Sequence, residues 1–172
     1  AVGGFIAIDF KNPKDPIIEK LPFDLTAAGY SLCIVNTGGN HADLNDDYAS
    51  VPAEMKKVAS YFGKTVLREV SLDEIVSNIP ELRKFAGDRA IMRSIHFVNE
   101  NERVAAQTEA LKMGDIDGFF AGVIASGNSS FKYLQNVYTI KNVSEQGLSL
   151  ALCLTEIALT GKKAAYRVHG GG

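Results

Sequence analysis

Two consecutive amphipathic segments within residues 88–134 constrain this chain more than any other feature of its sequence. Apolar residues recur there at helical spacing, as Ile91 and Ile95 do in the first segment. Between the two segments, Gly114 can adopt the left-handed conformation that ends one helix, and Asp115 can cap the start of the next. So short a connection predicts two antiparallel helices that share an apolar seam.

The second of these helices is too apolar to be left in water, because Phe119–Ile124 contains four large aromatic or β-branched side chains. It requires a flat apolar cover, and the rest of the chain offers strands. We predict a hairpin from 5–10 and 17–23, whose prolines lie in the connection, and a further strand at 164–168. The nearly unbroken apolar run Tyr30–Val35 predicts a central strand buried on both faces.

Further helices are expected around the central pair. Ser71-Leu-Asp-Glu74 matches a capping box, which predicts the start of a short helix. The helices expected outside the central pair run from 43–47 to about 62, from 72 to 82 and from 144 to 159. Strands and helices do not alternate as repeated βαβ units, so the sequence predicts an α+β fold with helices packed on one face of a small, mainly antiparallel sheet.

Composition limits the classes of function. A chain of 172 residues, 46% hydrophobic and 22% charged, forms one globular domain or one domain plus part of another. The net charge of −2, without a basic run, disfavours nucleic acid, and we expect no membrane partner because no apolar run is long enough to span a bilayer. Cys33 and Cys153 lie in apolar segments, which favours buried reduced thiols over a disulfide or metal pair and predicts a cytoplasmic protein.

Two polar loops are candidate ligand sites, one at 36–48 and one at 167–172. Each follows a predicted strand, where a rigid scaffold can hold an exposed loop. In the first loop, His41 can contact either a ligand or solvent. In the second, the glycines after His169 either expose N–H groups to an anion or form a glycine-rich tail.

Two clusters of possible metal ligands have simpler interpretations. Asp43, Asp46 and Asp47 are expected to cap a helix and compensate its dipole rather than bind a metal. His96 and Glu100 are one turn apart, which favours an ordinary pair on a helix surface over a metal site. The sequence shows no nucleophile–base pair, no Walker A motif and no dinucleotide-binding glycine motif.

Several motifs occur in a fixed order along the chain. They are Ile34-Val-Asn-Thr-Gly-Gly-Asn-His41 followed by Asp47-Tyr48, Arg93-Ser-Ile-His-Phe-Val-Asn-Glu-Asn-Glu-Arg-Val104, Ala110-Leu-Lys-Met-Gly-Asp115, and Arg167-Val-His-Gly-Gly-Gly172. Together they resemble the second domain of galactokinases, which belong to the GHMP family of small-molecule kinases. The resemblance implies the ferredoxin-like C-terminal domain of that family.

The resemblance also implies a domain division and an activity. Residues 1–28 would be the end of the N-terminal domain, and residues 29–172 a C-terminal domain that is incomplete at its C-terminus. The full-length parent would use ATP and Mg²⁺ to phosphorylate a hexose such as galactose. The aspartate that acts as the family's catalytic base and its phosphate-binding loop would lie outside this chain, in the missing N-terminal domain, so we expect the fragment to be inactive alone.

By the same resemblance, Tyr48 would contact the sugar, and Asn40, His41, Gly170 and Gly171 would complete the substrate site. No catalytic residue or metal ligand is assigned within this chain.

Departures from the family pattern leave alternatives open. Ser126-Gly-Asn-Ser129 keeps two serines of a family motif but lacks its histidine, and Asn40 replaces an arginine. The parent could therefore act on another hexose or a different small alcohol, or it could be a non-catalytic sensor of sugar or nucleotide.

Overall fold

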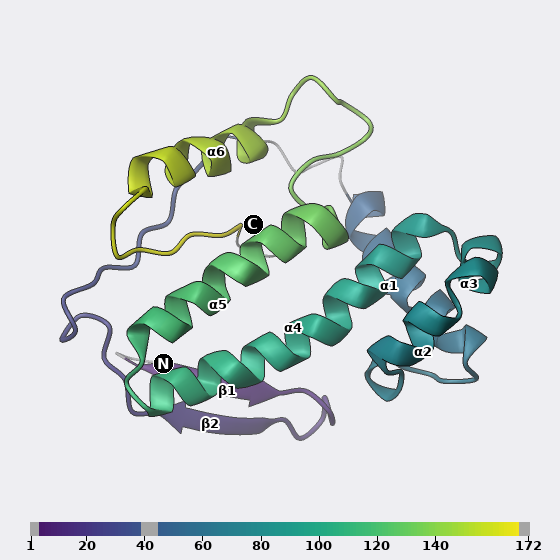
Figure 1. Cartoon of the computed structure of the whole chain (residues 1–172), viewed down its shortest axis with the longest axis horizontal. Helices are drawn as coiled ribbons and strands as arrows, with labels where there is room; N and C mark the ends of the chain where they lie inside the picture. The colour runs from purple at the N-terminus through teal and green to yellow at the C-terminus, as the bar shows by residue number, and fades with distance from the viewer. Residues whose placement is uncertain (1–3, 39–44, 169–172) are drawn as a thin grey trace.

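The two long predicted helices form the centre of the computed structural model (Figure 1). Helix α4 spans Asp88–Lys112, helix α5 spans Ile116–Ser129, and the two lie side by side. In the junction Gly114 has a φ of 70°, and the N–H of Gly118 donates to Asp115 Oδ1 at 2.9 Å. The predicted end of one helix and start of the next are thus confirmed.

The structure describes residues 4–38 and 45–168. The remaining elements are β1 (Phe5–Asp9), β2 (Ile17–Leu21), α1 (Asn45–Tyr61), the 3₁₀ turn η1 (Leu67–Glu69), α2 (Leu72–Ser77), α3 (Ile79–Phe85), the π-helical turn η2 (Ser130–Leu134) and α6 (Gly147–Leu159). Helices with a two-stranded antiparallel sheet make an α+β fold, as predicted. Within these ranges no helix combines the length and the apolar character needed to cross a membrane.

The β1–β2 hairpin packs where α4 passes into α5 (Figure 1). Phe5 pairs with Leu21 in the sheet, and its ring lies 5.4 Å from the ring of Phe119 on α5. Lys112 Nζ, at the end of α4, forms an ion pair of 2.9 Å with Glu19 on β2. The hairpin therefore supplies part of the cover that the apolar face of α5 requires.

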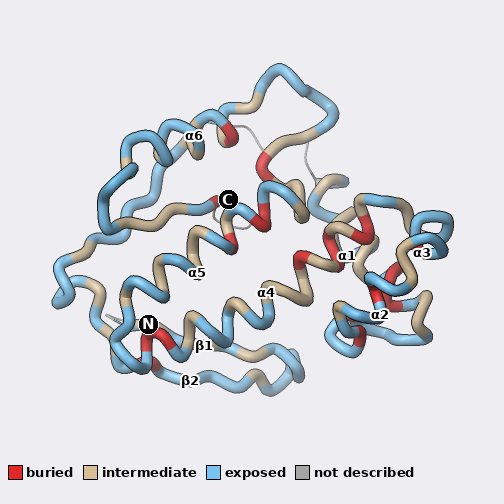
Figure 2. The backbone as a smooth tube through the Cα atoms, viewed as in Figure 1, coloured by how far each residue is buried: buried red, intermediate tan, exposed pale blue. Residues whose placement is uncertain are grey.

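The largest cluster of buried apolar residues lies between α1, α2, α3 and the first half of α4, where Figure 2 shows several buried residues. Val58, Ile75 and Leu82 have no exposed surface there. Burial of such side chains is worth about 1.5–3 kcal/mol each in transfer free energy. This end of the molecule therefore anchors α4.

The capping box at the start of α2 is confirmed, but the single helix predicted over 72–82 is wrong. Ser71 Oγ accepts from the N–H of Glu74 at 3.2 Å, and the Glu74 carboxylate accepts from the N–H of Ser71 at 2.8 Å. The helix breaks at Asn78, between α2 and α3. Pro80 has no N–H to donate, so it fits the first turn of α3 but not the interior of a continuous helix.

Two predicted strands are absent from the part of the chain that the structure describes. Neither Tyr30–Val35 nor 164–168 forms a ladder, and the side chains of Leu32, Ile34 and Val35 are 83%, 91% and 72% exposed. A strand requires hydrogen bonds to the main chain of a partner, and among the described residues no such bond joins 31–35 or 164–168 to another segment. The predictions of a buried central strand at Tyr30–Val35 and of a strand at 164–168 are therefore wrong for the described structure.

The prediction of buried cysteines is also corrected. Cys33 and Cys153 are free thiols, but both are exposed. Helix α4 begins at Asp88, and its N-cap residue is Gly87, whose φ of 89° suits glycine. Asp88 pairs with Arg83 at 2.7 Å.

Candidate functional site

The structure describes only one of the five predicted substrate-binding residues. Tyr48 lies in the first turns of α1 and is 43% exposed. Asn40, His41, Gly170 and Gly171 lie outside the described residues. The candidate site is therefore described from Tyr48 and from the contacts of two neighbouring segments. These segments are the start of α1, which follows Asn40 and His41, and residues 167–168, which precede Gly170 and Gly171.

The first turns of α1 are fixed by hydrogen bonds on both sides of Tyr48. Thr139 Oγ1 donates to Asp47 Oδ2 at 2.8 Å, which joins the helix to the loop before α6. Ser50 Oγ donates to the Asp47 carbonyl at 2.7 Å and accepts from Arg93 on α4 at 2.8 Å. The helix that carries Tyr48 is thus tied to two other parts of the molecule.

Arg93 is the central residue of this attachment, with only 3% of its surface exposed. Its guanidinium donates to Glu54 Oε2 at 2.9 Å and to the Leu134 carbonyl at 3.1 Å, in addition to Ser50. Burial lowers the pKa of Arg93 from its ordinary value, and the nearby Glu54 charge opposes that shift. Glu54 also accepts from Arg89 at 2.6 Å, so two arginines of α4 hold one carboxylate of α1.

A second group of polar side chains, which we call the α4–α5 polar cluster, lies farther along α4. Its members are His96, Glu100, Arg103, Ser126, Ser129 and Arg167. Ser129 Oγ lies 2.9 Å from His96 Nδ1 and accepts from Arg103 at 2.8 Å. Arg103 also donates to Glu100 at 2.7 Å, so one guanidinium connects the two helices.

The other half of the cluster holds the segment that leads to the glycine run. Arg167 donates to Ser126 Oγ at 2.6 Å, and Ser126 in turn contacts Glu100. Arg167 Nε donates to the carbonyl of Val168, whose side chain is buried. Residues 167 and 168 are therefore fixed against α5 immediately before the predicted glycine loop.

Gly127 allows this close approach. A Cβ built on Gly127 would lie 3.0 Å from Arg167 Cβ and 3.3 Å from the Tyr166 carbonyl oxygen. Gly127 occupies the place of the histidine in the family motif that this chain lacks. The departure seen in the sequence thus has a structural counterpart, because a side chain at this position would contact the segment that now packs directly on α5.

The cluster corrects two interpretations of the sequence. His96 and Glu100 are not an ordinary surface pair: His96 is only 6% exposed, and both bind residues of α5 or Arg103. His96 and Ser129 do form a hydroxyl–imidazole pair. The sequence did not reveal this pair because the two residues are 33 positions apart. Ser129 is equally inaccessible and accepts from Arg103, so the pair is built for packing and not for attack on a substrate.

Burial lowers the pKa of His96 from its usual value of 6.5, with Arg103 and Arg167 adding to the shift and Glu100 opposing it. Protonation is thus disfavoured in the folded state, so stability present above pH 6.5 is lost as pH falls toward the folded pKa. We expect the free energy of unfolding to drop as the pH falls below 6.5, by up to about 1.4 kcal/mol per pH unit.

The variant His96→Asn should lack this component, because an amide can retain the bond to Ser129 but does not titrate. Urea unfolding of both proteins at several pH values measures the difference. Identical slopes over this window would contradict the shift. Glu100 does not contribute in this pH range. Burial raises the pKa of its carboxyl, but hydrogen bonds from Ser126 and Arg103 outweigh burial and lower that pKa below its ordinary value of 4.5.

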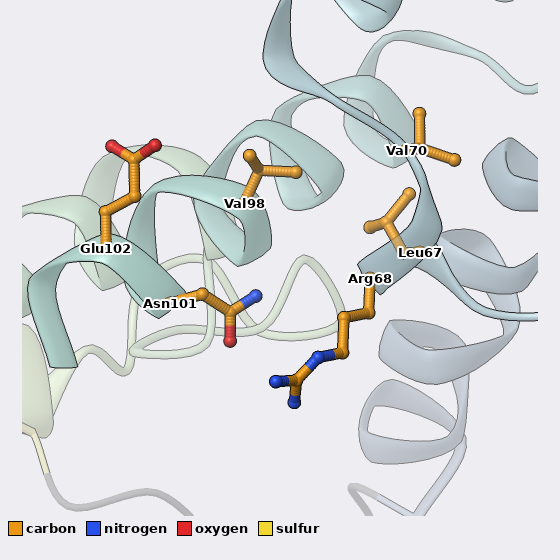
Figure 3. A pocket seen from close by; sticks show the side chains of 6 residues that line it. All are labelled: Leu67, Arg68, Val70, Val98, Asn101 and Glu102. Atoms are coloured by element: carbon orange, nitrogen blue, oxygen red, sulfur yellow. The ribbon is translucent and has the colours of Figure 1, made fainter. Parts of the chain in front are cut away.

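A hollow of about 230 Å³ lies elsewhere, between η1 and α4 (Figure 3). Arg68 and Asn101 face each other across it, with Leu67, Val70 and Val98 as its apolar wall. The Arg68 guanidinium is held by Asp9 at 2.6 and 2.8 Å. Tyr48, the one described residue of the predicted sugar site, does not line this hollow.

Comparison with known proteins gives the class to which these features correspond. No family model matches the chain. The curated proteins that it resembles are sugar kinases. In particular, they are galactokinases: the protein from Actinobacillus pleuropneumoniae is 29% identical over 144 residues, which is 84% of this chain and 35% of the relative.

Two further galactokinases give similar results. The protein from Streptomyces coelicolor is 29% identical over 123 residues, covering 72% of this chain and 31% of the relative. The protein from Mannheimia succiniciproducens is 33% identical over 86 residues, covering 50% of this chain and 22% of the relative. The predicted resemblance to galactokinases is thus confirmed, and the chain spans about a third of the length of the curated relatives it matches.

Proposed function

We propose that this chain is the substrate-facing part of a galactokinase-like sugar kinase. The parent transfers the γ-phosphoryl group of ATP to a hexose such as galactose. The observation that carries the proposal is the similarity to galactokinases over 84% of the chain. Both cysteines of the chain are free thiols, which fits the cytoplasmic location that we propose for the parent.

The attachment of two predicted site segments to the same helix supports this proposal. Arg93 of α4 holds the helix that carries Tyr48, and Glu100 of α4 holds Arg167, which precedes the glycine run. Seven residues along an α-helix correspond to about two turns, or roughly 10 Å. Anchors this close, on one rigid helix, suit two walls of a common sugar site.

Within that site we propose that Tyr48 contacts the hexose, and that Asn40, His41, Gly170 and Gly171 complete its binding surface. Phosphoryl transfer also needs bound phosphates, a metal and an oriented hydroxyl group. ATP and Mg²⁺ belong to the proposal for the whole protein, and no residue of this chain is assigned to either. Residues 1–28 are proposed as the end of an N-terminal domain and 29–172 as part of the C-terminal domain.

A substrate panel tests the proposal directly. The full-length gene product is assayed with ATP and Mg²⁺ against hexoses, mevalonate-like acids and amino alcohols, and the 172-residue chain is assayed in parallel. We expect the full-length protein to phosphorylate a hexose and the 172-residue chain to phosphorylate nothing. Turnover of a non-sugar alcohol alone, or sugar binding without turnover, would replace the proposal by a different kinase or by a sensor.

A further inference from the structure

The connection between η2 and α6, residues 135–146, is held in place by side chains of both elements that it joins. The Val137 side chain is buried, and its carbonyl oxygen accepts from Ser149 Oγ of α6 at 3.4 Å. The next residue, Tyr138, packs its ring against Phe131 of η2, with the ring centroids 6.1 Å apart. The connection is thus supported from two sides before it passes the start of α1 (Figure 1).

The following residue, Thr139, bonds to the first turn of α1. Its Oγ1 donates to Asp47 Oδ2 at 2.8 Å and accepts from the N–H of Lys141 at 3.2 Å. A hydroxyl group has one proton to donate, and a charged acceptor makes the stronger hydrogen bond. A second contact between the same segments is weaker, because Lys141 Nζ lies 3.6 Å from Asp46, whose side chain is 93% exposed. Thr139 is therefore the main polar link from this connection to α1.

Tyr48 lies between two anchored positions of α1. Asp47, in the first turn, is held by Thr139, and Ser50 accepts from Arg93 at 2.8 Å. The first turn of a helix lacks intrahelical partners for its N–H groups and frays easily. Because Tyr48 is the next residue after Asp47, about 100° farther around the helix axis, the direction of its side chain depends on how that turn is held. The anchor at Ser50 does not depend on Thr139.

We propose that Thr139 is a positioning residue of the sugar site. Its bond to Asp47 holds the first turn of α1 in the orientation in which Tyr48 meets the hexose. The inference rests on the proposed function, because the effect of Thr139 is assigned to Tyr48. It makes the connection between η2 and α6 a determinant of sugar affinity, although Thr139 itself does not touch the sugar.

The variant Thr139→Val tests the proposal in the full-length gene product, assayed with ATP, Mg²⁺ and galactose. Valine has a similar shape but no hydroxyl group, so Asp47 loses its donor. We expect the KM for galactose to rise about 10-fold with kcat nearly unchanged. The Tm should stay within about 2 °C of the wild type, since the anchor at Ser50 is retained. An unchanged KM would overturn the proposal.

Two further variants separate the hydroxyl bond from a general disturbance of the connection. Thr139→Ser keeps the hydroxyl group, so its KM should be close to that of the wild type. Ser144→Ala is the matched control, because Ser144 Oγ donates to Asn142 Oδ1 at 3.1 Å, within the same connection. We expect no change in KM for this variant. A rise in either variant equal to that in Thr139→Val would contradict a specific role for the bond to Asp47.

A double variant shows whether Thr139 acts through Tyr48. If it does, Tyr48→Ala combined with Thr139→Val should have the same KM as Tyr48→Ala alone. A further rise of about 10-fold in the double variant, as expected for independent sites, would overturn the proposal.

The same measurements distinguish failure of this inference from failure of the proposed function. If the protein does not phosphorylate galactose, or if Tyr48→Ala leaves the KM unchanged, the proposed sugar site fails and the role of Thr139 fails with it. If Tyr48→Ala raises the KM and Thr139→Val does not, only the role of Thr139 is overturned.

Discussion

Replacing Arg93 with methionine is expected to lower the free energy of unfolding by about 2–4 kcal/mol. Arg93 is 3% exposed and donates to Ser50, Glu54 and the Leu134 carbonyl. Methionine fills much of the same space but leaves these acceptors without their donor. Glu54 retains Arg89 as a partner, which keeps the loss below that of a fully isolated buried charge.

Urea unfolding at pH 7, with the slope of the transition compared as well as its midpoint, measures this loss. The matched control is Arg83→Met, which removes a second arginine–carboxylate pair, that of Arg83 with Asp88, on the surface. Both partners of that pair are 63% exposed, so we expect little or no change in stability. Equal midpoints for the two variants would show that Arg93 does not secure α1.

Replacing Tyr48 with alanine in the full-length gene product is expected to raise the KM for the sugar by about 10- to 100-fold. The reason is that a ring contact and a hydroxyl hydrogen bond to the hexose would both be lost. Tyr48 is 43% exposed, which leaves part of its side chain accessible to a ligand. The expected signature is a large rise in KM with a smaller change in kcat.

Tyr48→Phe separates the two contributions, since it keeps the ring and removes only the hydroxyl group. Thermal unfolding of both variants should match the wild type within about 2 °C, which excludes a general loss of structure. An unchanged sugar KM in Tyr48→Ala would remove Tyr48 from the site. The similarity to galactokinases would remain, but no residue that the structure describes would then be proposed to contact the sugar.

Local sequence signals were sufficient for the central helices. The periodicity of Ile91 and Ile95, the glycine at 114 and the cap at Asp115 all act within a few residues, and all three were confirmed. The capping box at Ser71 was found for the same reason. These features depend on hydrogen bonds between near neighbours, which a sequence displays directly.

The predicted strands divide according to whether a partner is present in the chain. The hairpin of β1 and β2 contains both of its strands and was predicted correctly. The segments at 30–35 and 164–168 have β-prone sequences but no described partner, and they form no ladder. The burial of Cys33 and Cys153 was overestimated for the same reason, because an apolar neighbourhood in sequence does not guarantee a cover in space.

The α4–α5 polar cluster could not have been predicted from spacing. Its contacts join His96 to Ser129 and Ser126 to Arg167, across 33 and 41 residues, and they exist only because two helices and a terminal segment pack in one register. The available signal was two serines one turn apart on the face of α5 that meets His96 and Glu100. That pattern is too common to indicate a specific contact by itself.

The position of both anchors on α4 has a consequence for how this protein can change. Adding or deleting one residue between Arg93 and Glu100 would turn one anchor about 100° around the helix axis relative to the other. One of the two attached segments would then lose its anchor, whatever residue was inserted. Substitutions at the exposed residues of this interval would leave both anchors in place, whereas a change in its length of seven residues would not.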